Sequence, residues 1–208
     1  MSSSGSSQPS SVIPAEVLAN EPRWLVQFGA PAAFIAGIVL IIAIGVRVTG
    51  LLPPHHLIAL SLYALTDLLI VLTLASLWRS HACGNGLAAK IGLGLAALGY
   101  ILDVPGELLT ETSRRTATTL SSVGVSLFAV GMIVAGISML IARRWHGWHR
   151  FVPLALGAYI PVVLIPSLIL RRGPDLAFAL LGVLYLVLGL AVRTEHTRPR
   201  QMSSNISE

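Results

Sequence analysis

The chain has 208 residues, of which 14 are lysine or arginine and 9 are aspartate or glutamate, so charged residues make up 11% of it. Soluble domains carry about 25% charged residues. Hydrophobic residues account for 54% of the chain, and the mean hydropathy is +0.79. So few charges cannot cover a water-facing surface, which excludes a soluble enzyme and a nucleic-acid-binding domain. A disulfide-rich domain is also excluded, because Cys83 is the only cysteine.

The apolar residues are gathered in runs of about 20, the length at which a helix crosses the hydrocarbon core of a bilayer. The runs end at basic residues or at helix breakers such as Pro53-Pro54. We therefore predict an all-α, polytopic transmembrane bundle. Its six helices are expected over residues 26–46, 57–78, 87–102, 120–142, 151–170 and 175–192.

The polar ends of the chain are expected to lie outside this bundle. Residues 1–11 are rich in serine, and residues 194–208 are polar, a composition typical of disordered tails. The whole N-terminal stretch is expected to be disordered or to lie at the membrane interface. The predicted organisation is therefore an N-terminal tail over 1–25, a transmembrane domain over 26–193 and a C-terminal tail over 194–208.

Two features of the runs predict how the helices pack. Pairs of small residues one turn apart allow close helix contact in lipid, and they occur at Ala33/Gly37, Gly92/Ala96 and Gly131/Ala135. The fifth run contains Pro161 and Pro166. Prolines within a span favour a kinked helix whose freed carbonyls are satisfied by neighbours, so we expect this span to lie inside the bundle.

Basic residues predict the orientation, because lysine and arginine are enriched in cytoplasmic connections. With six spans, both tails and the second–third and fourth–fifth connections share one side. That side holds nine basic residues: Arg23, Arg79, Lys90, Arg143, Arg144, Arg150, Arg193, Arg198 and Arg200. The other side holds five: Arg47, Arg114, Arg115, Arg171 and Arg172. Both termini are therefore expected in the cytoplasm, with the chain integral to the cytoplasmic membrane.

Asp67 is the first candidate functional residue, because it lies near the middle of the second span. A carboxylate at that depth costs several kcal/mol unless it is neutralised or paired. Tyr63, four residues earlier, shares its helix face, and Thr66 is adjacent. Two interpretations stay open. The carboxyl group holds helices together by hydrogen bonds, or it accepts protons or contacts a ligand inside the bundle.

Asp103, Glu107 and Glu111 form a second acidic group near the end of the third span. Their i, i+4, i+8 spacing places them on one face if the helix continues past Pro105, whereas a helix ending there leaves the glutamates in a loop. One interpretation is a salt-bridge network with Arg47 or Arg114-Arg115. The others are an entry for protons or cations, and a carboxyl pair for acid–base chemistry.

The histidines do not predict a metal site or a haem. His81, Cys83, His146 and His149 share one side, but their spacing matches no zinc pattern. Trp145 and Trp148 favour a membrane-interface anchor for that segment. Phosphate-binding, dinucleotide-binding and hydrolase motifs are absent from the sequence, and we predict no metal and no cofactor.

Several features are shared with a known group of proteins. They are a basic turn at 78–81, a glycine-rich third span at 92–99, and paired arginines before a tryptophan-containing connection at 143–148. In these features residues 26–193 resemble a broad group of uncharacterised bacterial six-helix integral membrane proteins. The resemblance implies a membrane location and a helix count, and it assigns no functional residue.

The leading functional hypothesis is a multi-pass membrane protein that binds or passes a small or lipid-like ligand at a polar point near Asp67. One alternative is a membrane-embedded enzyme that uses Asp67, Asp103 and Glu107 on an apolar substrate. The other is a non-catalytic subunit of a membrane complex. The expected partners are the lipid bilayer and either a small apolar ligand or a membrane protein, with no nucleic acid. An enzyme needs two acidic groups on one cavity, and a transporter needs a path to both faces.

Overall fold

The computed structural model describes residues 23–51, 57–80, 83, 86–109, 113–143, 145, 147–171 and 173–204. The N-terminal tail predicted over 1–25 lies outside them apart from its last three residues, which begin the first helix. Every element within the described residues is helical. They are α2 (Arg23–Val48), α3 (Leu57–Arg79), α4 (Leu87–Leu108), α5 (Arg114–Ala142), η1 (Gly147–Phe151), α6 (Val152–Tyr159), η2 (Ile160–Leu164), α7 (Ile165–Leu170) and α8 (Pro174–Ser204).

Among the described residues, six helical stretches of 20 to 29 residues are long and apolar enough to cross a membrane, with η1, α6, η2 and α7 together forming the fifth. The predicted all-α bundle of six spans is thereby confirmed, and a multi-pass membrane protein is compatible with it. The outward-facing side chains fit a lipid environment, since Ile42, Leu68, Ile141 and Val162 are all more than half exposed.

Two helix ends differ from the sequence prediction. The third span continues through Pro105 to Leu108, which resolves the alternative left open there. The fourth begins at Arg114, six residues before the apolar run. The added turn is polar but helical, with the Ala117 N–H donating to the Ser113 carbonyl. The Thr118 and Thr119 hydroxyls are satisfied on this turn by donating to the carbonyls of Arg114 and Arg115.

The last helix also extends further than composition indicated, since α8 runs to Ser204 rather than ending near Arg193. A helix that is already nucleated and packed extends at little cost, because each added residue makes one more hydrogen bond.

The fifth span is interrupted, as its prolines predicted, but it does not lie inside the bundle. Residues 160–164 form a π-helical turn, closed by a hydrogen bond from the Ile165 N–H to the Ile160 carbonyl. Pro161 and Val162 are exposed on the outer surface. The expectation of an interior span was therefore wrong. The π-helical turn accommodates Pro161 within the span itself, so neighbouring helices are not needed on every side to satisfy the freed carbonyl groups.

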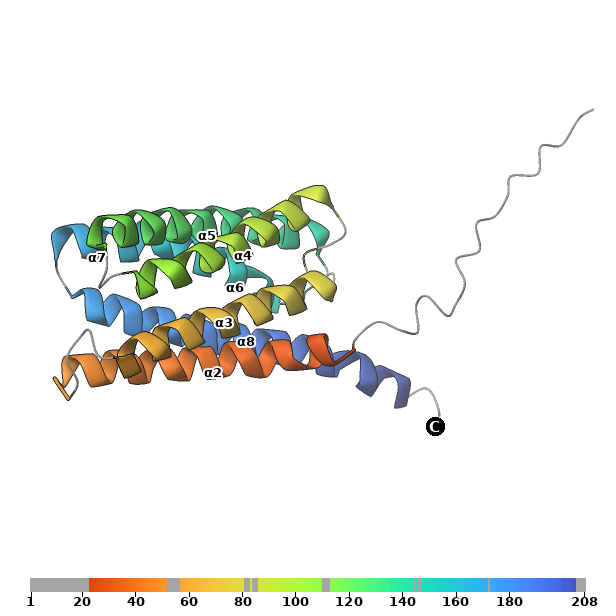
Figure 1. Ribbon diagram of the computed structural model, residues 1–208. Coiled ribbons are helices and arrows are strands. Elements are labelled where there is room, and N and C mark those ends of the chain that lie inside the picture. Colours follow the sequence, from red (N-terminus) through yellow and green to blue (C-terminus); the bar gives the residue numbers. More distant parts are fainter. Residues whose placement is uncertain are drawn as a thin grey trace, which may run out of the picture.

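The six spans contact one another in the order of a closed ring. Each packs against its neighbours in the chain, and α8 packs against α2. No other pair of spans brings Cα atoms of the described residues within 8 Å of each other. Seen from the side, the ring is flattened into two layers, with α2, α3 and α8 in one layer and α4, α5, α6 and α7 in the other (Figure 1). No span therefore passes through the centre of the ring.

Small residues set the closest helix contacts, as the sequence predicted. A Cβ atom added at Gly92 would lie 2.7 Å from the Ala135 nitrogen and 2.8 Å from the Gly131 carbonyl oxygen. A Cβ atom at Gly37 would lie 2.6 Å from the Gly182 carbonyl oxygen of α8. The α4–α5 and α2–α8 backbones thus approach to a distance that larger residues would prevent.

Both ends of the described chain lie at the same end of the bundle (Figure 1). We call it the termini end, and we call the opposite end, with the connections that follow α2, α4 and α7, the far end. Exposed basic side chains are found at the termini end, including Arg79, Lys90, Arg143 and Arg193.

Candidate functional site

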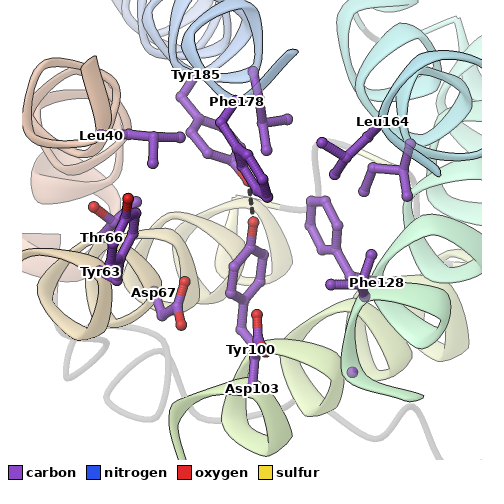
Figure 2. A pocket seen from close by; sticks show the side chains of 14 residues that line it. Leu40, Tyr63, Thr66, Asp67, Tyr100, Asp103, Phe128, Leu164, Phe178 and Tyr185 are labelled. Atoms are coloured by element: carbon purple, nitrogen blue, oxygen red, sulfur yellow. Dashed lines mark hydrogen bonds between the residues drawn. The ribbon is translucent and has the colours of Figure 1, made fainter. Parts of the chain in front are cut away.

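A cavity of about 70 Å³ lies at the centre of the ring. A water molecule needs about 10–15 Å³ of such space, so the cavity has room for several waters or one small organic molecule. Every span contributes to its wall, and Figure 2 shows the spans surrounding it. The lining residues are Leu40, Tyr63, Thr66, Asp67, Tyr100, Asp103, Gly124, Val125, Phe128, Ile160, Leu164, Phe178, Leu181 and Tyr185.

The cavity belongs to the far half of the bundle. Its residues come from the first halves of α3, α5 and α8 and the second half of α4, all of which lie toward the far end. In the termini half, the buried Thr73 and Ser76 of α3 lie at the contact with Gly29 of α2. The other side chains that fill the interior there, among the described residues, are mostly apolar and fully buried. These include Leu74, Leu77, Met132, Met139, Leu156, Leu188 and Val192.

Helix α3 supplies one polar wall. Tyr63, Thr66 and Asp67 have the i, i+3, i+4 spacing that places side chains on one helix face. Thr66 lines the cavity, and its hydroxyl donates to the Leu62 carbonyl of the same helix at 2.9 Å. Asp67 is only 6% exposed and projects toward Tyr100 of α4 (Figure 2).

Helix α4 supplies the second carboxyl group. Asp103 lines the same cavity as Asp67, and the Ser121 side chain of α5 hydrogen-bonds to it. Close packing of α5 at this level depends on Gly124, where an added Cβ atom would lie 3.3 Å from the Asp103 nitrogen. Two carboxyl groups from different spans therefore converge on one space.

The structure does not describe the side chains of the other two members of the predicted acidic group, Glu107 and Glu111. Glu107 follows Asp103 by one helical turn. Arg47, which the sequence offered as a partner for this group, forms an ion pair instead with Asp175. Its Nε atom lies 3.4 Å from Asp175 Oδ1. The pair joins the far ends of α2 and α8.

Two tyrosines connect opposite sides of the ring. The hydroxyl groups of Tyr100 and Tyr185 hydrogen-bond to each other, although α4 and α8 are not neighbours (Figure 2). Phe128 of α5 packs edge-on against the Tyr100 ring, with centroids 4.6 Å apart. Three of the aromatic side chains that line the cavity are thus in contact with one another.

The electrostatic character of the cavity is one-sided. Among its lining residues are two carboxylic acids and no lysine, arginine or histidine. Asp67 and Asp103 share this space with Tyr100 and Tyr185. The site is therefore an acidic, aromatic cavity within an apolar bundle.

Sequence reasoning singled out Tyr63, Asp67 and Asp103, and the structure brings all three to this cavity. It missed Phe128, Phe178 and Tyr185. A signal was available for Tyr185, because a tyrosine hydroxyl deep within a span must find a hydrogen-bonding partner. No sequence signal distinguishes the two phenylalanines from the apolar residues that face lipid.

The histidine- and tryptophan-containing connection is not part of the site. Trp148 is 55% exposed, as a membrane-interface anchor would be, but Trp145 is 5% exposed and belongs to the core, so its predicted anchoring role was wrong. His149 Nε2 lies 3.2 Å from the Thr194 hydroxyl. Within the described ranges no three histidine, cysteine or acidic residues are grouped as metal ligands, and His81 and His146 lie outside those ranges.

Comparison with protein-family models, with curated proteins and with solved structures gives no match to this chain. What the cavity can do follows from its own residues.

Proposed function

We propose that this chain is a multi-pass protein of the cytoplasmic membrane that binds a small ligand in the cavity at the centre of the ring, with Asp67 as the main polar contact. The supporting observation is that Asp67, a buried acid in a membrane-spanning helix, lines a space to which all six spans contribute. An intramembrane carboxyl group on a cavity is a typical feature of ligand and ion sites in membrane proteins.

Binding is favoured over free passage by the contrast between the two halves of the bundle. The cavity occupies the far half, whereas the described residues fill the termini half mostly with buried apolar side chains such as Met132, Leu156 and Leu188. A channel needs a polar path between both faces. A ligand in this cavity would reach the termini end only through a second conformation of the ring.

A second candidate is a membrane-embedded enzyme, and one observation favours it. Asp67 and Asp103 line the same cavity, as an acid–base pair acting on an enclosed substrate must. The two candidates differ in what leaves the site, because a binding protein releases its ligand unchanged and an enzyme releases a product. Incubation of any bound compound with purified protein, followed by mass analysis of the small molecules, distinguishes them.

Native mass spectrometry tests the binding proposal directly. The full chain, purified in mild detergent, is expected to retain a small molecule that is released on unfolding. Val125→Phe fills the cavity without removing a polar group, and it should abolish retention while the protein stays folded. Val123→Phe is the matched control, since Val123 is on the exposed face of the same helix two residues away. Retention that is equal in both variants would refute a ligand in this cavity.

A further inference from the structure

We infer that the ligand of this cavity is a small organic cation, of the size of a substituted ammonium ion. The inference rests on the proposed function and adds the chemical class of the ligand. Three properties of the cavity support it, namely the sign of its charge, its aromatic walls and its size.

The charge is the first property. Asp67 and Asp103 approach one space from different spans, and none of the residues that line it is basic. Arg47 was one of the basic residues that the sequence offered as partners for the acidic group around Asp103. It forms an ion pair with Asp175 instead. Two carboxyl groups within an apolar bundle repel each other when both are charged, and a bound cation relieves that repulsion. An anionic ligand would have no countercharge among the lining residues.

The aromatic walls are the second property, and they select the kind of cation. Five of the lining residues are tyrosine or phenylalanine, contributed by α3, α4, α5 and α8. Rings that surround a space attract organic cations through their electron-rich faces, which is how aromatic cages bind substituted ammonium groups. Magnesium and calcium ions prefer six or more oxygen ligands. Only two of the lining residues are carboxylic acids, and among the described residues no three histidine, cysteine or acidic residues are grouped as metal ligands. The hydroxyls of Tyr100 and Tyr185 are already bonded to each other.

The size of the cavity is the third property. About 70 Å³ of space, with room for several waters, accommodates a compact ammonium ion but not a whole phospholipid. The apolar lining residues, such as Leu40, Leu164 and Leu181, match the alkyl substituents of such an ion. A proton alone would not require the apolar and aromatic part of this wall.

Choline and 3,3-dimethyl-1-butanol provide a test, because they have nearly the same shape and only choline is charged. Isothermal titration calorimetry of the full chain in detergent micelles is expected to show saturable binding of choline and much weaker binding of the alcohol. Asp67→Asn keeps the size of the side chain and should weaken choline binding by about 10- to 100-fold. Phe178→Leu keeps the wall apolar and should weaken it by about two- to fivefold.

Asp175→Asn is the matched control, because it removes a carboxylate at the far end of the bundle that is not among the lining residues. It should leave choline binding unchanged. Equal or tighter binding of the neutral alcohol would overturn the cation assignment and leave the proposed binding function standing. Binding of neither probe, or choline binding that survives Asp67→Asn combined with Asp103→Asn, would also overturn it. The Val125→Phe mass measurement decides the proposed function separately.

Discussion

Tyr100 of α4 and Tyr185 of α8 hydrogen-bond to each other across the middle of a ring in which their helices are not neighbours. This bond lies where the cavity of the far half meets the apolar packing of the termini half. Each hydroxyl is buried, so each depends on the other for a hydrogen bond within the bundle.

The tyrosine pair should therefore behave as one unit in stability measurements. Tyr100→Phe leaves the Tyr185 hydroxyl without this bond, and it should lower the free energy of unfolding by about 1–3 kcal/mol. Tyr185→Phe should act similarly. The double variant should cost less than the sum of the two, because it removes both hydroxyls together. Unfolding of the purified protein by a denaturing detergent gives the four values. Strict additivity would show that the two hydroxyls do not interact.

The small residues between α4 and α5 give a second prediction. Gly131→Ala places a Cβ atom 2.5 Å from the Gly92 carbonyl oxygen, so the helices must separate, at a cost of about 1–3 kcal/mol. Gly45→Ala is the control, since nothing lies within 4 Å of a Cβ atom there. That change should be neutral or stabilising by about 0.5–1 kcal/mol. The same unfolding assay compares them, and equal effects would contradict the observed interface.

Cys83 lies in the connection between α3 and α4, outside the membrane-spanning segments, and its thiol should resist modification. Burial raises the pKa of this thiol from its usual 9.0 to about 12. At pH 7–9 the folded protein should thus react with maleimide far more slowly than the protein unfolded in detergent, in which the thiol is exposed. Rapid labelling of folded protein at neutral pH would contradict its buried position.

The same shift makes a prediction about stability. The folded-state pKa of the thiol is higher than the unfolded-state value. Below pH 9 the thiol is neutral in both states, and its contribution to stability is fully present. As the pH rises from 9 to 12 the thiol ionises in the unfolded state first, so this contribution is lost. Replacement by alanine removes the ionisable group. The loss of stability across this pH range should therefore be smaller in Cys83→Ala than in the natural chain, and an identical loss in both would refute the assignment.

The orientation in the membrane is a further prediction, which rests on nine basic residues against five. Thr116→Cys places a thiol near the far end, and Leu87→Cys places one at the termini end, both at exposed positions. In intact cells a membrane-impermeant maleimide should label the first and not the second, with buried Cys83 giving little background. Cell lysis should make both reactive. The reverse pattern would place the termini outside.

The spans and the acids were predictable from sequence because both follow from the cost of polar groups in lipid. Apolar runs of fixed length predicted the six helices, and an acid within a run identified Asp67. The direction that each apolar side chain faces was not predictable. Leu68 is 64% exposed and Ile70 is 1% exposed, yet they have similar chemistry. Lipid and a protein core are equally apolar, so the hydrophobic pattern that orients a helix in a soluble protein is missing.

The same reason explains why the aromatic wall was missed. Phe128 and Phe178 line the cavity, whereas Phe34 is exposed on the outer surface, and nothing in their local sequence separates the two cases. Asp103 was recognised as a candidate, but its joint placement with Asp67 depends on the order of helices in the ring. That order is a property of the tertiary structure, and the sequence of a single span does not contain it.

The ring order has a consequence for assembly during synthesis. Each span packs against the span before it in the chain. A helix that enters the membrane after α2 can therefore pack at once against a helix that is already inserted, and the chain segments that join the two are short. Only the contact between α8 and α2 joins distant parts of the chain. Until the last span has inserted, the five described spans before it form an open row of helices. The polar residues on α3 and α4 are then accessible to lipid. The cavity therefore becomes enclosed only when the final helix is in place.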